Sequence, residues 1–147
     1  MSCMKDDLFL IDTNIFVYAF DSSEKIKQKI AFELIDKCFR GERVYALSSQ
    51  NLAEFFNIVT KKIQNPISLQ DAKNIMIKII EFKGFIKLNY NQNTVINTIK
   101  LLEKDGLKFW DSLLIATMLE NNIFNIYTEN EKDFSKIKAI NVINPFK

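Results

Sequence analysis

Short apolar segments alternate with longer amphipathic segments along this chain, and this alternation restricts the fold more than any other property of the sequence. The apolar segments cover residues 8–11, 44–47, 85–88, 125–127 and 142–143. Such runs, bounded by polar or turn-forming residues, are typical of strands buried on both faces. Strands that alternate with helices form a mainly parallel sheet. We therefore expect an α/β fold built on a short central sheet.

The segments between these strands carry helical periodicity and helix-end signals. Helices are expected over residues 15–20, 24–40, 49–64, 68–84, 91–104 and 110–122. Ser68, with Asp71 three residues later, resembles a capping box at the start of the fourth helix. In the fifth helix Val95, Ile99 and Leu102 fall on one side, which predicts that this side faces the core.

The length and charge of the chain restrict its class. We expect a single domain over residues 1–147, because this length is enough for one core. With 20 basic and 18 acidic residues the net charge is +2, so we expect no strong general affinity for nucleic acid or membranes. No segment approaches the roughly 20 apolar residues of a membrane-spanning helix. Met1–Asp7 also lacks the apolar core of a signal peptide.

Missing residue types exclude several chemistries. The sequence has no His, which excludes His-based acid–base catalysis, His-activated nucleophiles and the common zinc sites. The two cysteines, Cys3 and Cys38, cannot form a structural zinc site and fit a reducing, cytoplasmic setting. With only three Gly, the glycine-rich phosphate-binding loops are absent. Catalysis is therefore expected to depend mainly on Asp, Glu, Lys, Tyr, Ser and Thr.

Acidic residues follow several of the predicted strands. Asp12 comes directly after the first strand, Glu54 lies in the helix after the second, and Asp111 begins the sixth helix. The segment after the fourth strand contains further candidates, among them Asp133. Ligand sites of parallel sheets lie at the carboxyl ends of the strands. Carboxylates gathered there without His favour a hard cation such as Mg²⁺ or Mn²⁺.

Two of these acids have alternative interpretations. Asp12 is equally well placed to cap the helix that follows it. Asp111 could complement a helix dipole, but it lies on an apolar stripe with Leu114, Ile115 and Met118. A carboxylate on such a stripe is expected to be buried, and buried acids are usually paired or bound to metal. The stripe therefore favours a functional role for Asp111.

Periodicity gives Glu54 a different assignment from the other acids. Phe55 and Val59 belong to the apolar stripe of its helix, and Glu54 falls on the opposite side. On this pattern alone Glu54 is a solvent-facing surface acid. Asp133 is open to a local capping or pairing role. Surface positions are also expected for Asp21, Glu129 and Glu131.

Several segments, taken in order, resemble the PIN-domain nuclease family. They are Leu8–Asp21, Leu47–Phe55, Phe109–Ala116, Tyr127–Asn130 and Ile143–Phe146. The similarity spans essentially the whole chain, and within the family it is greatest to the toxin components of VapBC-type toxin–antitoxin pairs. The resemblance implies a three-layer α/β/α sandwich and a metal-dependent ribonuclease that uses Mg²⁺ or Mn²⁺.

The resemblance also implies the residues of the site. The acidic residues of the family correspond to Asp12, Glu54 and Asp111, so Glu54 gains a role that periodicity did not give it. Many relatives carry a fourth acid where this chain has Asn130, and others have one at Asp133, which we favour here. If Asn130 replaced the fourth acid, weaker metal binding would be expected. Supporting hydrogen bonds are expected from Thr13, Asn14, Ser49, Thr128 and Asn130.

On this interpretation the carboxylates hold one or two cations that activate water and stabilise the leaving oxygen of an RNA phosphodiester. Lys61, Lys62 or Lys108 would contact flanking phosphates, with an ordinary solvated surface as the alternative. The expected partners are an RNA substrate, a cognate antitoxin and a second copy in a homodimer, with no membrane partner. Two other functions stay open: a PIN nuclease of RNA processing without an antitoxin, and a catalytically weak RNA-binding module.

Overall fold

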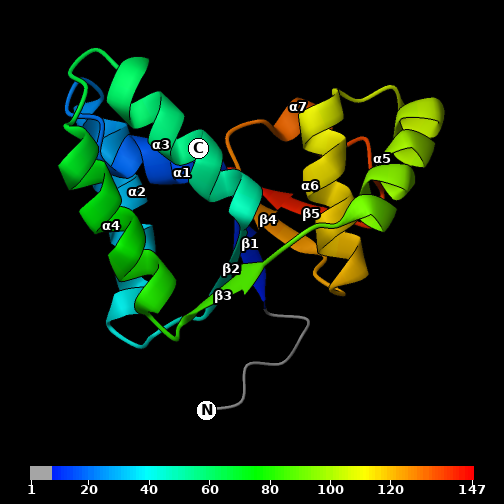
Figure 1. Ribbon diagram of the computed structural model, residues 1–147, viewed down its shortest axis with the longest axis horizontal. Coiled ribbons are helices and arrows are strands. Elements are labelled where there is room, and N and C mark those ends of the chain that lie inside the picture. The colour runs from blue at the N-terminus through cyan, green and yellow to red at the C-terminus, as the bar shows by residue number, and fades with distance from the viewer. Residues whose placement is uncertain (1–7) are drawn as a thin grey trace.

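Five short parallel strands form the centre of the computed structural model, which describes residues 8–147 (Figure 1). The strands are β1 (Phe9–Ile11), β2 (Tyr45–Ser48), β3 (Phe85–Leu88), β4 (Asn125–Tyr127) and β5 (Asn141–Ile143). Their order in the sheet is β3-β2-β1-β4-β5, and each neighbouring pair is parallel. The predicted strands are confirmed, with ends that differ by at most one residue.

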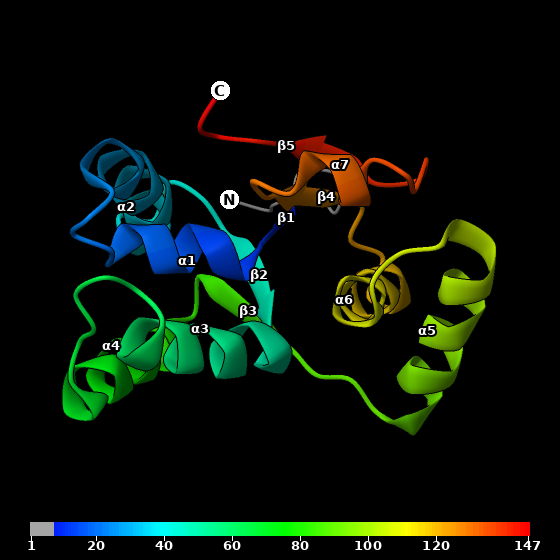
Figure 2. The same cartoon turned by 90° about the horizontal axis from the view of Figure 1, so that it is seen from above.

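Helices cover both faces of this sheet (Figure 2). One layer contains α1 (Thr13–Ala19), α2 (Lys25–Phe39), α3 (Ser49–Lys61) and α4 (Leu69–Glu81). The other contains α5 (Gln92–Asp105), α6 (Phe109–Glu120) and the short α7 (Glu131–Phe134). The expected α/β/α sandwich is therefore confirmed.

Alternation along the strands divides the core into two clusters, one on each face of the sheet. Ile11, Leu47 and Phe85 pack with the helices α1 to α4. Their strand neighbours Leu10 and Ala46 pack with α6 and α7 on the other face. Successive side chains of a strand point to opposite faces, so β1 to β4 contribute to both clusters, whereas the edge strand β5 contributes only Val142, to the second. This two-sided burial explains why the strands are apolar along most of their length.

Helix ends follow the capping signals of the sequence. Ser48 and Ser68 accept hydrogen bonds from the backbone N–H groups of Asn51 and Asp71, at the starts of α3 and α4. Gly106 ends α5 in the left-handed conformation, which glycine adopts without the steric cost of a Cβ atom. The local sequence therefore sets the lengths of these helices.

Helices α5 and α7 differ from the sequence-based prediction. The buried residues of α5 are Thr94 and Thr98, while Val95 and Leu102 of the predicted side are only partly buried and Ile99 is 43% exposed. Thr94 and Asn97 donate hydrogen bonds to Glu120 of α6, and these polar contacts join the two helices. The single turn of α7 is too short to produce a helical period, and no helix was expected there.

The strand order creates a switch point between β1 and β4. From β1 the chain moves outward to β2 and β3 on one side, and then crosses to β4 and β5 on the other. Ligands of such sheets bind in the crevice at the carboxyl ends of the strands that flank the switch point. Asp12 and Thr128 are the residues that directly follow these two strands.

Other expectations concern the ends and the surface of the chain. The segment Met1–Asp7, including Cys3, lies outside the described residues, so the structure does not bear on its predicted lack of a signal peptide. Cys38 is a buried thiol without a disulfide partner in the part of the chain that the structure describes. None of the described helices is both long enough and apolar enough to cross a membrane.

Candidate active site

A cavity of about 450 Å³ lies at the carboxyl ends of β1 and β4. Five acidic residues line it, and three of them, from separate parts of the chain, are the ones we call the cavity acids. Asp12 follows β1, Glu54 belongs to α3, and Asp111 belongs to α6. Asn130, from the loop after β4, lines the same cavity. The fold therefore brings together three acids that are far apart in the sequence.

Three hydrogen bonds fix the carboxylate of Asp12. Its Oδ1 accepts from the backbone N–H of Thr13 at 2.8 Å, so Asp12 is the N-cap of α1. Its Oδ2 accepts from the Thr128 hydroxyl at 2.7 Å and from the Asn14 amide at 3.2 Å. The two interpretations of Asp12 are therefore compatible, because the same carboxylate caps the helix and lines the cavity.

Glu54 lines the cavity and is partly buried. The Thr13 hydroxyl donates to Glu54 Oε1 at 3.5 Å, and Asn51 Nδ2 donates to that hydroxyl at 2.9 Å. The solvent-facing position that periodicity gave Glu54 is wrong. Phe55 and Val59 of α3 do face the core, but the other side of the helix borders the cavity. Helical periodicity does not distinguish a polar cavity from open solvent.

Asp111 and Asp133 are connected through the amide of Asn130. Asn130 Nδ2 donates to Asp111 Oδ2 at 3.3 Å and to Asp133 Oδ2 at 3.1 Å. Asp133 also forms an ion pair with Lys136, with 3.7 Å between Oδ1 and Nζ. Asn130 lines the cavity, whereas Asp133 is not among the lining residues. The amide therefore occupies the position between the two acids.

Burial raises the pKa of all three cavity acids. For Asp12 burial outweighs the hydrogen bonds to its carboxylate, and the charges of Glu54 and Asp111 add to the effect, so its pKa rises to about 6. Burial also raises the pKa of Glu54, with a contribution from the charge of Asp111. It raises the pKa of Asp111, with a contribution from Asp133. The ionised acids therefore destabilise one another.

The cavity acids lack a cationic partner. Within residues 8–147 no Lys or Arg forms an ion pair with Asp12, Glu54 or Asp111. Buried carboxylates without a counter-charge are costly, and an oxygen-liganded divalent cation would offset their repulsion. The donor set therefore fits a hard cation. The described residues contain no preassembled group of three acidic or Cys side chains in metal-binding geometry.

Most of the residues predicted to support the acids contact them. Hydrogen bonds to the cavity acids come from Thr13, Asn14, Thr128 and Asn130. Ser49 does not join them, because its exposed hydroxyl donates to Asn89. Asn51 takes part instead, through the Thr13 hydroxyl. Sequence reasoning missed Asn51, although its place three residues after Ser48 is a capping-box signal.

The cavity extends along α1, away from the acids. Tyr18, Asp21 and Glu24 line this part of it. Asp21 is only 7% exposed, so its predicted surface position is wrong. Its Oδ1 accepts from both the backbone N–H and the hydroxyl of Ser23. These local hydrogen bonds satisfy the buried carboxylate at the end of the helix.

The three lysines considered for phosphate contacts are exposed and do not line the cavity. They are Lys61, Lys62 and Lys108. Lys108 precedes α6, and its charge lowers the pKa of Asp111, which partly opposes the larger effect of burial. The exposed side chains of Phe109 and Trp110 lie between Lys108 and Asp111 in the sequence. Their rings pack edge-on, with 5.0 Å between centroids. A basic and aromatic surface therefore adjoins one of the cavity acids.

Comparison with known proteins places this fold and cavity in a family. The family model described as the PIN domain matches residues 9–140, a segment that includes all of the cavity acids. The chain belongs to the PIN domain family. The resemblance seen in the sequence motifs is thus confirmed. A search of curated proteins found no match to this PIN domain.

Solved structures similar to this PIN domain include proteins of toxin–antitoxin systems. A toxin–antitoxin complex from Klebsiella pneumoniae has a TM-score of 0.64 at 20% identity, with 93% of this chain and 97% of that chain covered. VapBC-1 of nontypeable Haemophilus influenzae has a TM-score of 0.64 at 21% identity, with coverages of 95% and 99%. VapC20 of Mycobacterium tuberculosis, described as a sarcin-ricin loop cleaving toxin, has a TM-score of 0.64 at 16% identity, with coverages of 87% and 92%. At these identities the likeness shows a shared fold.

Proposed function

We propose that this PIN domain is a metal-dependent endoribonuclease that hydrolyses RNA phosphodiester bonds. One observation carries the proposal: Asp12, Glu54 and Asp111 line one cavity at the switch point, with raised pKa values. No ion pair among residues 8–147 neutralises them. Oxygen ligands without His or Cys favour Mg²⁺ or Mn²⁺. Membership of the PIN family supports a nuclease activity.

The residues of the cavity have distinct roles in this proposal. The carboxylate ligands are Asp12, Glu54 and Asp111. A bound Mg²⁺ or Mn²⁺ supplies Lewis acidity, which lowers the pKa of water and offsets the charge that develops on the phosphodiester. Thr128 and Asn14 donate hydrogen bonds to Asp12 Oδ2 and so fix the orientation of its carboxylate. Such outer hydrogen bonds hold metal ligands in place and tune their basicity.

Asp133 is proposed as the fourth acid, with Asn130 as its neighbour. Hydrogen bonds from Asn130 Nδ2 to both acids hold Asp133 close to Asp111. The Asn130 side chain also reaches the cavity and has an amide oxygen that could serve as a neutral ligand. A neutral ligand at this position lowers the affinity for a divalent cation relative to a carboxylate.

The substrate and partners are proposed from the relatives and from the surface beside the site. Structural relatives are described as toxin–antitoxin complexes and as a sarcin-ricin loop cleaving toxin. We propose that this chain is likewise a toxin, with a cognate antitoxin, acting as a cytoplasmic homodimer. The exposed rings of Phe109 and Trp110, next to Asp111, offer stacking surfaces for unpaired bases. This surface favours single-stranded RNA.

Cleavage of labelled single-stranded RNA by the purified protein tests this function. The assay compares Mg²⁺, Mn²⁺ and EDTA, and the variants Asp12→Asn and Asp111→Asn. Asp36→Asn is the matched control, because Asp36 is paired with Arg40 outside the cavity. We expect metal-dependent cutting that is lost in both cavity variants and kept in the control.

Other outcomes separate the alternatives. Cutting that persists in both cavity variants comes from another site or a contaminant and contradicts the residue assignments. RNA binding without metal-dependent cutting indicates a catalytically weak RNA-binding module. The antitoxin is tested by co-purification with the product of any small adjacent reading frame. An active nuclease with no such partner fits a role in RNA processing.

A further inference from the structure

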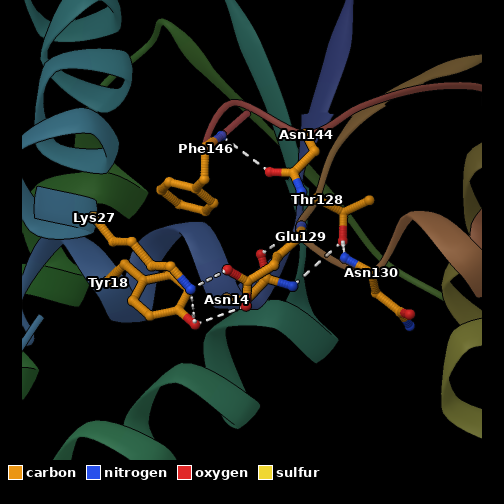
Figure 3. Close-up of polar contacts among 8 residues, drawn as sticks. All are labelled: Asn14, Tyr18, Lys27, Thr128, Glu129, Asn130, Asn144 and Phe146. Atoms are coloured by element: carbon orange, nitrogen blue, oxygen red, sulfur yellow. Dashed lines mark hydrogen bonds and ion pairs between the residues drawn. The ribbon is translucent and has the colours of Figure 1, made fainter.

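The loop after β4 is anchored on two opposite sides. On the cavity side, Thr128 donates a hydrogen bond to Asp12 and Asn130 donates one to Asp111. The side chain of the intervening Glu129 points away from Asn130, toward α1 and α2 (Figure 3). Glu129, predicted as a surface acid, is partly buried, with 33% of its side chain exposed. The residue between the two cavity contacts is therefore held elsewhere in the molecule.

Glu129 contacts a lysine and a tyrosine at once. Lys27 Nζ, on α2, lies 2.6 Å from Glu129 Oε2, and the Tyr18 hydroxyl, on α1, donates to Oε1 at 2.7 Å. Lys27 Nζ also donates to the Tyr18 hydroxyl at 3.4 Å and lies 4.8 Å from the centre of the Tyr18 ring. The ring of Phe146 packs edge-on against Tyr18, with 5.1 Å between centroids. The side chains of Tyr18, Lys27 and Glu129 thus contact one another in a closed triangle, with the ring of Phe146 beside it (Figure 3).

The central contact of this triangle joins two charged groups. Burial acts to raise the pKa of Glu129, but the hydrogen bonds from Lys27 and Tyr18 outweigh it, and the pKa lies below its usual value. The hydrogen bond to Glu129 raises the pKa of Lys27 to about 12. Hydrogen bonds between ionised groups are shorter and stronger than those between neutral groups. The contact is therefore retained across neutral pH.

Glu129 also reaches the cavity acids through its backbone. Its N–H donates to Asn14 Oδ1 at 3.3 Å. The amide nitrogen of Asn14 in turn donates to Asp12 Oδ2 at 3.2 Å and to Thr128 Oγ1 at 3.3 Å. A displacement of Glu129 would therefore disturb the donors that orient Asp12. Loss of such outer partners typically changes metal affinity by about 10- to 100-fold.

We propose that Tyr18, Lys27 and Glu129 form a latch that positions the loop after β4, and through it the cavity acids, for cation binding. We call this cluster the Glu129 latch, and the inference rests on the function proposed above. The three side chains are positioning residues, because they act through Thr128 and Asn130. The latch also connects helices α1 and α2 to the site, so its integrity determines the geometry of the site.

Lys27→Met separates positioning from simple electrostatics. Removing a positive charge near an acidic cavity would by itself favour cation binding, whereas loss of the latch weakens it. We expect the Mn²⁺ concentration at half-saturation to rise about 10-fold. Lys27→Arg keeps the charge and the donors, so we expect it to stay within about 3-fold of the parent. Calorimetric titration of the full chain measures binding, and thermal unfolding verifies that each variant is folded.

Glu129→Gln has a closely matched control two residues along the chain, at the start of α7. Glu131 pairs with Lys147 at the same N–O distance of 2.6 Å, and its side chain is 35% exposed. Glu131→Gln therefore removes the same charge from a neighbouring position outside the latch. We expect Glu129→Gln to raise the Mn²⁺ midpoint about 10-fold, and Glu131→Gln to change it less than about 2-fold. Equal effects of the two substitutions would overturn the latch, because charge alone would then explain both.

Amide hydrogen exchange tests the latch without metal. The backbone N–H of Thr128 donates to Ile143 and that of Asn130 to the Thr128 hydroxyl. We expect exchange of these amides to be about 10-fold faster in Lys27→Met and near the parent rate in Lys27→Arg. If Lys27→Met does not fold, Tyr18→Phe replaces it, because it removes the hydroxyl and keeps the ring.

The outcomes distinguish the latch from the proposed function. Unchanged amide exchange together with unchanged or tighter Mn²⁺ binding in Lys27→Met overturns the latch. A parent protein that binds no Mn²⁺ contradicts the proposed function instead. In that case the exchange rates of Lys27→Met and Lys27→Arg decide the latch on their own.

Discussion

Acidic residues gather in two parts of this molecule with opposite electrostatic properties. At the end of α2, Glu33, Asp36 and Glu42 surround Arg40, with N–O distances of 2.7 to 3.1 Å. Hydrogen bonds from Arg40 lower the pKa of Glu33 and of Glu42. In the cavity, burial raises the pKa of each of the three cavity acids. No ion pair among residues 8–147 offsets the charges of the cavity acids.

This difference shows why the number of acids does not by itself identify a site. Both groups contain three carboxylates, but those of the Arg40 group lie near the surface and each forms an ion pair with Arg40. Exposed ion pairs of that kind contribute little to stability. The cavity acids are instead partly buried and have no ion-pair partner among residues 8–147, an arrangement that a bound cation would stabilise. Perturbed acids in a cleft are therefore the better candidates for function.

The largest contrast between the two groups is expected in RNA cleavage. Asp12→Asn and Asp111→Asn each remove a proposed cation ligand. We expect each to lower the cleavage rate by more than about 100-fold, beyond the effect of losing an outer hydrogen bond. Glu42→Gln, in the Arg40 group, should leave the rate unchanged. Equal losses in both groups would show that the substitutions act through folding.

A smaller loss is expected when an orienting hydroxyl is removed from the cavity. Thr128→Val deletes the donor to Asp12 Oδ2, and we expect about a 10-fold lower cleavage rate with weaker Mn²⁺ binding. Thr117→Val is the matched control, since Thr117 is also fully buried but bonds to the carbonyl of Leu113. A cleavage rate for Thr128→Val that equals that of Thr117→Val would rule out an orienting role.

An additional carboxylate in the cavity is expected to strengthen cation binding. Asn130→Asp places a negative charge where the amide now bonds to Asp111 and Asp133. We expect Mn²⁺ affinity to rise about 5-fold, which corresponds to about 1 kcal/mol. Calorimetric titration measures this change. The control is Asn93→Asp, at an exposed position of α5. Unchanged affinity would contradict a contribution of this position to cation binding.

The smallest expected effect is on stability as a function of pH. The pKa of Asp12 is raised to about 6 in the folded protein from 3.8. Its ionised form therefore destabilises the fold above that pH, and this penalty decreases as the pH falls from about 6 towards 3.8. From about pH 7.5 to 5.5 we expect the metal-free protein to gain about 1 kcal/mol, or 2–4 °C in Tm. Thermal unfolding in EDTA measures the gain, which should be smaller in Asp12→Asn.

Local signals were sufficient for the framework of the fold and for part of the site. The inner strands β1, β2 and β4 are mostly apolar because they are buried on both faces, so their ends could be predicted from composition. Asp12 stands directly after such a strand, and Asp111 lies on the apolar stripe of α6. The position of each of these two acids could therefore be predicted from its own neighbours in the sequence.

Contacts between distant elements explain what the sequence did not reveal. Glu54 lies opposite the apolar stripe of α3, and only the neighbouring elements make that side a cavity. Glu129 and Lys27 are 102 residues apart, and no local pattern encodes their contact. In α5, Thr94 faces inward because Glu120 of α6 accepts its hydrogen bond, which leaves the nearby Ile99 exposed.

Calorimetric titration with Mn²⁺ tests most directly whether the cavity acids form a divalent-cation site. The titration compares the parent with Asp12→Asn and with Glu42→Gln, which removes an equivalent charge from the Arg40 group. We predict binding to the parent and to Glu42→Gln with the same affinity, and loss of binding in Asp12→Asn. Binding that survives in Asp12→Asn with unchanged affinity would contradict the assignment of the cavity acids as the cation site.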